Sequence, residues 1–121
     1  MRKGRCYWIE RDGQILLRER PPKGMLAGMR ALPDDNWSAR ADGNQRQPIA
    51  GEWEILHSAV QHSFTHFDLV MDIAIYRSQI AARQSLDGVW WPIDNLASAG
   101  LPTVFAKAAR IMIEERICSI K

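Results

Sequence analysis

Three hydroxyl-bearing residues lie within a few positions of the chain's three histidines: Ser58, Ser63 and Thr65. A serine or threonine becomes a hydrolytic nucleophile when a base takes its proton and an acid holds that base in place. The chain has no Gly-x-Ser-x-Gly turn that would expose such a serine, and no acidic residue is spaced to orient one of the histidines. The sequence therefore predicts no catalytic residues in this chain.

The histidines and cysteines also offer little to a metal ion. His62 and His66 would share one face of a helix, but their segment has the pattern of a strand and loop, and no carboxylate or cysteine completes a ligand set. Cys6 and Cys118 lie at opposite ends of the chain without a neighbouring cysteine, which excludes a disulfide framework, a four-thiolate zinc site and an iron–sulfur cluster. We expect reduced cysteines, no metal and no cofactor in this chain.

Length and composition indicate one compact domain over residues 1–121. Of the 121 residues, 46% are hydrophobic and five are tryptophan, which is enough for one core. The apolar runs are far shorter than the roughly 20 residues of a membrane span, and the first residues lead into no apolar signal stretch. We expect a soluble, intracellular protein without membrane contact.

Charge is unevenly distributed along the chain. Residues 1–30 contain eight Lys and Arg against three Asp and Glu, a balance of +5, so the net charge of +2 leaves −3 for the remainder. A basic surface of this kind can follow a phosphate backbone, but an ordinary solvated surface with some excess arginine gives the same count. The charge pattern leaves both interpretations open.

The first half of the chain predicts a hairpin and a long loop. Residues 5–11 and 14–20 are β-prone and flank Asp12-Gly13, a dipeptide that tolerates the positive φ angles of a tight turn. The prolines and glycine of residues 21–24 then predict a loop. Residues 34–52 are polar and rich in Gly, Pro, Asn and Asp, so we expect a long loop with little regular structure.

The second half predicts three strands and two helices. Residues 53–60 and 89–91 have strand patterns, and within residues 64–76 alternate positions share one apolar face: Phe67, Leu69, Met71, Ile73 and Ile75. Asp94 is placed to cap a short helix that Gly100 ends, and residues 103–117 form an amphipathic helix. Strands mixed with two helices predict a single α+β domain.

Three blocks of sequence, in their order and spacing, together resemble one protein family. They are LLRERPPKGMLAGM from Leu16 with Leu32-Pro33, HSFTHFDL from His62, and Trp91-Pro92 followed by Leu101-Pro102 and Lys107. In these blocks the chain is similar to the carboxy-terminal, Nudix-like domain of the MutY adenine DNA glycosylases, over roughly residues 6–115. The resemblance implies a Nudix-like fold, in which a mixed β-sheet is packed between helices.

The resemblance also implies a role in base excision repair in the bacterial cytoplasm, at the nucleoid. In this family a helix-hairpin-helix lobe with catalytic carboxylates, and usually an iron–sulfur cluster, removes adenine that is paired with 8-oxoguanine. The carboxy-terminal domain helps to recognise the oxidised base. This chain contains no such lobe, so we expect a non-catalytic, monomeric piece of a longer glycosylase. Its expected partners are double-stranded DNA with 8-oxoguanine opposite adenine, and the catalytic lobe.

The family's lesion-contacting loop matches Phe64, Thr65 and His66. 8-Oxoguanine carries an N7–H donor beside a C8 carbonyl, where guanine has an N7 acceptor, and a hydroxyl can both accept and donate. Thr65 could therefore read the altered edge, while Phe64 wedges into or packs beside the opened stack and His66 contacts a phosphate or supports the loop. The alternative is purely structural: Phe64 and Phe67 as core residues, Thr65 as an ordinary strand residue and His66 as a turn residue.

Two departures from family patterns matter. Arg30 stands where the MutY domain commonly has tryptophan, which puts the packing of that loop in doubt. Active Nudix hydrolases resemble one another in a helix whose clustered carboxylates hold Mg²⁺, whereas here only Asp34 and Asp35 follow the corresponding glycine loop. The pair Glu114-Glu115 lies on the last helix, where we expect it to be solvated. A divergent hydrolase of oxidised nucleotides and a protein-interaction module are therefore the alternative functions.

Overall fold

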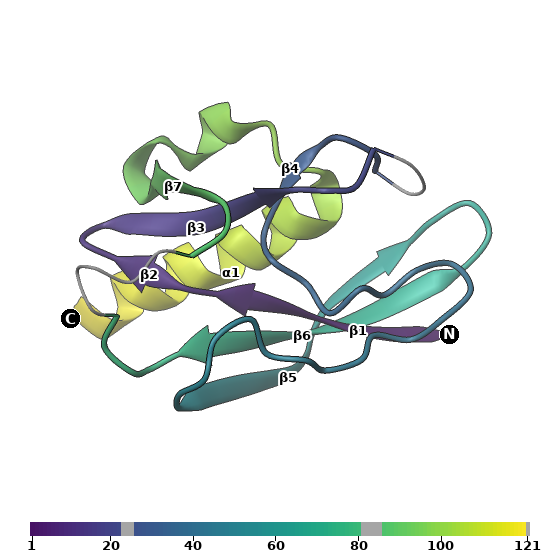
Figure 1. Ribbon diagram of the computed structural model, residues 1–121, viewed down its shortest axis with the longest axis horizontal. Coiled ribbons are helices and arrows are strands. Elements are labelled where there is room, and N and C mark those ends of the chain that lie inside the picture. Colours follow the sequence, from purple (N-terminus) through teal and green to yellow (C-terminus); the bar gives the residue numbers. More distant parts are fainter. Residues whose placement is uncertain (23–25, 81–85, 121) are drawn as a thin grey trace.

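The computed structural model describes residues 1–22, 26–80 and 86–120, with side chains described up to residue 115 (Figure 1). In chain order the elements are β1 (Arg2–Trp8), β2 (Glu10–Arg11), β3 (Gln14–Glu19), β4 (Arg30–Ala31), β5 (Trp53–Ser63), β6 (Asp68–Tyr76), β7 (Val89–Pro92), the 3-10 helix η1 (Ile93–Ala99) and the helix α1 (Thr103–Ile120). Lys23 and Gly24 of the predicted loop, and the side chain of Cys118, lie outside the described residues. Neither helix in the described part of the chain is long and apolar enough to cross a membrane.

The strands form two sheets. In the first sheet β6 lies between β1 and β5, parallel to β1 and antiparallel to β5. In the second sheet β3 pairs with β2, β4 and β7, always antiparallel. The predicted α+β class with a mixed sheet is confirmed, and the strands divide between two sheets.

The predicted first hairpin is only partly correct. Asp12 and Gly13 have φ angles of 53° and 76°, as a tight turn between β2 and β3 requires. However, the first strand of this hairpin is only Glu10–Arg11, because residues 2–8 pair with β6 in the other sheet. A local pattern of apolar residues cannot reveal a parallel partner that lies far along the chain.

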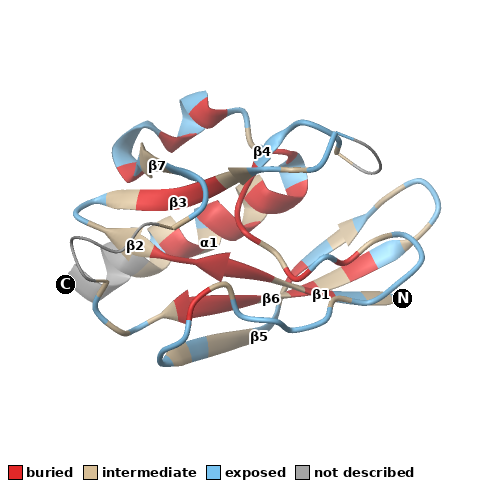
Figure 2. Ribbon diagram, viewed as in Figure 1, coloured by how far each residue is buried: buried red, intermediate tan, exposed pale blue. Residues whose placement is uncertain are grey.

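A large apolar cluster joins side chains from both sheets, η1 and α1. Figure 2 marks the buried residues of these elements in red. The predicted apolar face of β6 contributes four buried residues to it: Leu69, Met71, Ile73 and Ile75. Phe67, predicted on the same face, precedes the strand and is half-buried against this cluster. The amphipathic pattern of the last helix is also confirmed, since Val104, Ala108 and Met112 are buried.

The short helix η1 begins differently from the sequence expectation. Its N-cap position is occupied by Pro92 without a side-chain hydrogen bond, and Asp94 lies within the first turn. Pro92 takes this place because it ends β7, so the helix follows the strand directly. Gly100 has a φ of 73° and ends the helix as predicted.

Arg30 links β4 to the region of η1. Its guanidinium Cζ lies 4.5 Å from the ring centroid of Trp91, and its Nη1 donates to the carbonyl of Ala99 at 3.1 Å. Arginine therefore finds defined partners at the position where the MutY domain commonly has tryptophan.

Residues 33–45 form a loop along the edge of β1, which we call the edge loop. The N–H of Asp35 donates to the carbonyl of Arg5 at 3.1 Å, and the N–H of Gly43 donates to that of Lys3 at 2.8 Å. Residues 34–52 contain no strand or helix in the structure, as predicted, apart from one isolated bridge. The edge loop nevertheless satisfies main-chain groups that an open strand edge would leave to solvent.

Candidate functional site

The turn of the β5–β6 hairpin carries the three residues predicted to contact the lesion. Residues 64–67 form this turn, which the N–H of Phe64 closes by donating to the carbonyl of Phe67 at 2.8 Å. Thr65 and His66 are exposed, whereas Phe64 and Phe67 are half-buried. The hairpin turn lies at the same end of the molecule as the N-terminus (Figure 1). Thr65 thus belongs to an exposed turn and not to a strand.

Aromatic rings hold Phe64 from several sides. Its ring stacks on Phe67, with centroids 4.8 Å apart and planes 19° apart, and meets His62 edge to face at 4.6 Å. The centroid of Trp37, from the edge loop, lies 5.9 Å away. Such contacts stabilise packed aromatic rings beyond their buried area. This packing agrees with the structural alternative, in which Phe64 and Phe67 belong to the core.

Trp37 is itself fixed within the molecule. It is 1% exposed, and its ring centroid lies 6.0 Å from that of Phe105 on α1. The guanidinium Cζ of Arg20 lies 4.9 Å from the Trp37 centroid, and Arg20 also forms an ion pair with Asp34. The support of the hairpin turn therefore includes Arg20, which directly follows β3, together with the edge loop and α1.

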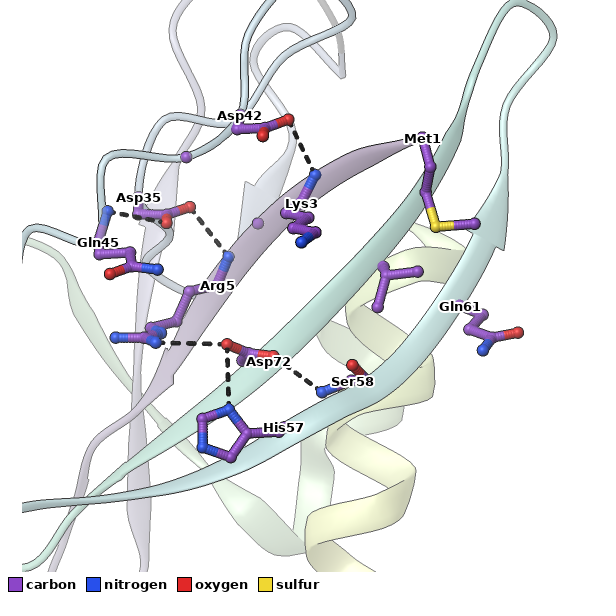
Figure 3. Close-up of a pocket in the computed structure, with 13 residues that line it drawn as sticks. Met1, Lys3, Arg5, Asp35, Asp42, Gln45, His57, Ser58, Gln61 and Asp72 are labelled. Carbon is purple, nitrogen blue, oxygen red and sulfur yellow. Dashed lines mark hydrogen bonds and ion pairs between the residues drawn. The ribbon is translucent and has the colours of Figure 1, made fainter.

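A pocket of about 560 Å³, which no sequence pattern indicated, lies between the first sheet and the edge loop (Figure 3). Asp72 of β6 projects into it and binds two neighbouring strands. Its Oδ2 lies 3.3 Å from Nη2 of Arg5 and 3.8 Å from Nδ1 of His57, and its Oδ1 accepts from the N–H of Ser58 at 2.8 Å. This polar network joins β1 and β5 across β6.

In this pocket Asp72 lies near His57, although no acidic residue is spaced along the sequence to orient a histidine. Strand pairing is irregular between Leu56 and Val60, and Ser58 has a φ of 52°. This bulge places His57 and Ser58 next to Asp72, a consequence that spacing along one strand does not show. Ser58 takes part through its backbone N–H and His57 is largely exposed, so the network is an ion-pair arrangement and not a nucleophilic triad.

Comparison with known families resolves the relationship of the chain. The NUDIX domain family matches residues 5–110. The chain belongs to the Nudix family. No curated protein sequence matches this Nudix domain.

Three solved structures share the fold of this Nudix domain. The carboxy-terminal domain of mouse MUTYH, solved in complex with human PCNA, superposes with a TM-score of 0.68 at 18% identity, covering 94% of this chain and 88% of that chain. The E. coli ORF135 protein superposes with a TM-score of 0.59 at 18% identity, covering 94% of this chain and 89% of that chain. The Nudix hydrolase RenU from M. smegmatis superposes with a TM-score of 0.54 at 17% identity, covering 96% of this chain and 85% of that chain. The predicted Nudix-like fold is therefore confirmed.

Asp34 and Asp35 are not arranged like the clustered carboxylates that hold Mg²⁺ in Nudix hydrolases. Asp34 is paired with Arg20, and Asp35 accepts from the N–H groups of Arg5 at 2.9 Å and Gln45 at 3.0 Å. Burial, the main cause, raises the pKa of both carboxyl groups. Within residues 1–22, 26–80 and 86–115, no three His, Cys, Asp or Glu side chains are grouped to hold a metal. Both aspartates instead stabilise the edge loop.

Proposed function

We propose that this Nudix domain recognises 8-oxoguanine in duplex DNA through Thr65 and His66, as the lesion-recognition part of a MutY-type adenine DNA glycosylase. The observation that carries the proposal is the exposure of these two polar side chains on a turn whose flanking phenylalanines are anchored. In such a glycosylase the adenine opposite the lesion is flipped and removed by a separate helix-hairpin-helix lobe with an iron–sulfur cluster.

The chemistry of the turn suits the oxidised purine. The Thr65 hydroxyl can accept from N7–H or donate to O8, and main-chain groups of the open turn can supply the complementary partner. A good two-point contact of this kind discriminates between bases by about 1–3 kcal/mol. His66 is placed on the same turn to hydrogen-bond a neighbouring phosphate, which would orient the domain without reading sequence.

Direct binding tests this function. The chain would be titrated at low salt with two duplexes that differ only in 8-oxoguanine or guanine opposite adenine, with fluorescence anisotropy as the measurement. We expect weak binding to both duplexes that falls steeply with added salt, and a preference of about tenfold for 8-oxoguanine, or about 1.4 kcal/mol. Equal affinities for the two duplexes would contradict the proposal.

A second candidate is hydrolysis of oxidised nucleotides, which membership of the Nudix family favours. Against it, Asp34 and Asp35 are occupied by Arg20 and by backbone N–H groups. Incubation with Mg²⁺ and 8-oxo-dGTP, with release of pyrophosphate or phosphate as the measurement, separates the two functions. Robust turnover would favour the hydrolase.

A third candidate is a protein-interaction module, favoured by the mouse MUTYH domain, which was solved in complex with PCNA. Binding to a sliding clamp would be measured over the salt range used for DNA. Phosphate contacts weaken steeply with ionic strength, so clamp binding that persists after DNA binding is lost would identify a separate protein contact.

A further inference from the structure

Lys107 of α1 is bonded to the end of β5, just before the turn at residues 64–67. We propose that Lys107 and His62 form a brace that sets the conformation of this turn, so that Lys107 is a positioning residue for Thr65 although it does not touch the lesion. The inference rests on the proposed function for its consequence in DNA recognition, but the brace itself can be measured without DNA.

Lys107 meets two consecutive residues of β5 just before the turn. Its Nζ donates to the carbonyl of Gln61 and to Nδ1 of His62, each at 3.0 Å. Both bonds are charge-assisted, and such bonds are roughly twice as strong as neutral ones. One side chain of α1 therefore holds the main chain and a side chain of the strand that leads into the turn.

The bond also decides the state of His62. An ammonium group can only donate, so Nδ1 must present a lone pair and the ring proton must lie on Nε2. Burial, followed by the charge of Lys107, lowers the pKa of His62 below its usual 6.5, which keeps the ring neutral near pH 7. The neutral ring then contacts Phe64 edge to face, at 4.6 Å and 68°.

Phe64 connects His62 to the turn. Its N–H closes the turn onto Phe67, its ring stacks on Phe67, and Thr65 follows it directly in the chain. The helix α1 also supports Phe64 indirectly, because Phe105 packs against Trp37 and Trp37 packs against Phe64. Without Lys107 the aromatic support would remain, but the bonds that hold the end of β5 against α1 would be lost.

The brace predicts a specific effect of Lys107→Met, which removes the ammonium but keeps a long, helix-compatible side chain. The matched control is Arg110→Met, because Arg110 is exposed on the same helix and its loss changes the net charge equally. In ¹⁵N NMR spectra of the chain, we expect His62 to change from a fixed Nε2–H tautomer to a mixture in Lys107→Met alone. We also expect the Phe64 amide to exchange with solvent about tenfold faster in this variant, and Arg110→Met to match the wild type.

A second pair of variants keeps the test independent of Lys107. His62→Asn retains an acceptor near the place of Nδ1, whereas His62→Leu removes it; both lose the imidazole ring. We expect slower exchange of the Phe64 amide in His62→Asn than in His62→Leu. Equal exchange in this pair, or an unchanged tautomer and unchanged exchange in Lys107→Met, would overturn the brace whatever the DNA measurements give.

DNA binding then separates the brace from the function. We expect Lys107→Met to lower the ratio of affinities for the 8-oxoguanine and guanine duplexes several-fold, and Arg110→Met to leave this ratio unchanged. Both variants should weaken binding to the guanine duplex equally. Two results together would overturn the positioning role and leave the proposed function standing. Lys107→Met would keep the wild-type ratio of affinities for the 8-oxoguanine and guanine duplexes, and Thr65→Val would lower that ratio. A wild-type chain that does not prefer 8-oxoguanine would instead overturn the proposed function and, with it, the role of Lys107 in recognition.

Discussion

At Thr65, two substitutions separate the side-chain hydroxyl from the shape of the side chain. Thr65→Val keeps the branched shape and removes the oxygen, whereas Thr65→Ser keeps the oxygen. Thr65 is exposed, so neither change disturbs the core. We expect Thr65→Val to narrow the preference for 8-oxoguanine over guanine by about 2- to 12-fold, the factor for a hydrogen bond of about 0.5–1.5 kcal/mol, and Thr65→Ser to stay close to the wild type. Duplex titration would measure the ratio of affinities for 8-oxoguanine and guanine in both variants. The same ratio in Thr65→Val and Thr65→Ser would mean that the hydroxyl makes no recognition contact.

Among single residues, the family resemblance placed Thr65 and His66 in one loop, and the structure has both exposed on a turn, while their contact with a lesion stays a prediction. The sequence could not reveal the contacts of His57 with Asp72 or of His62 with Lys107. The first contact depends on a bulge in β5, and the second joins a strand to a helix 45 positions away. Lys107 formed part of the family resemblance, but only the structure supplies a partner for it.

The edge loop is packed so closely against β1 that one methyl group should disturb it. A Cβ at Gly4 would lie 2.5 Å from Cδ1 of Trp37, whose ring is buried. Gly4→Ala is therefore expected to destabilise the fold by about 1–3 kcal/mol, as overpacked sites do.

Urea unfolding of a double-mutant cycle would check this expectation. In a Trp37→Leu background, where the smaller side chain leaves space, the cost of Gly4→Ala should fall. A cost that is the same in both backgrounds would show that the strain does not arise from Trp37.

At the level of elements, the amphipathic pattern predicted α1, and the alternating pattern predicted β6 but began it at residue 64, whereas the strand begins at Asp68 and residues 64–67 form the turn. Local pattern was insufficient for residues 2–11, which divide between two sheets. It also described residues 34–52 as an irregular loop without indicating that Trp37 and Ile49 are buried in two different apolar clusters. Long-range pairing and packing determine both features, and a window of neighbouring residues contains neither.

The lowered pKa of His62 should make the stability of the whole molecule depend on pH. The pKa of His62 is lowered in the folded chain, so the unfolded chain binds more protons just below pH 6.5. The free energy of unfolding should therefore decrease as the pH falls from 7.5 through 6.5, until the folded-state pKa is reached. Asp34 and Asp35 act in the opposite sense at lower pH, because their pKa values are raised and protonation favours the folded chain.

Urea titrations of the wild type and His62→Asn at pH 7.5 and 5.5 would test the contribution of His62. We expect a smaller loss of stability between these two pH values in the variant. An identical loss in both proteins would mean that His62 is not the group responsible.

We propose that the exposed turn of the β5–β6 hairpin senses the oxidised edge of guanine. The most direct test is an NMR titration of the chain with a duplex that contains 8-oxoguanine opposite adenine, and with the matched guanine duplex. We expect the amide resonances of Thr65 and His66 to shift with both duplexes, but clearly further with 8-oxoguanine. Shifts at these residues that are the same for both duplexes, or shifts confined to His57 and Gln61 in the pocket beside Asp72, would contradict this account.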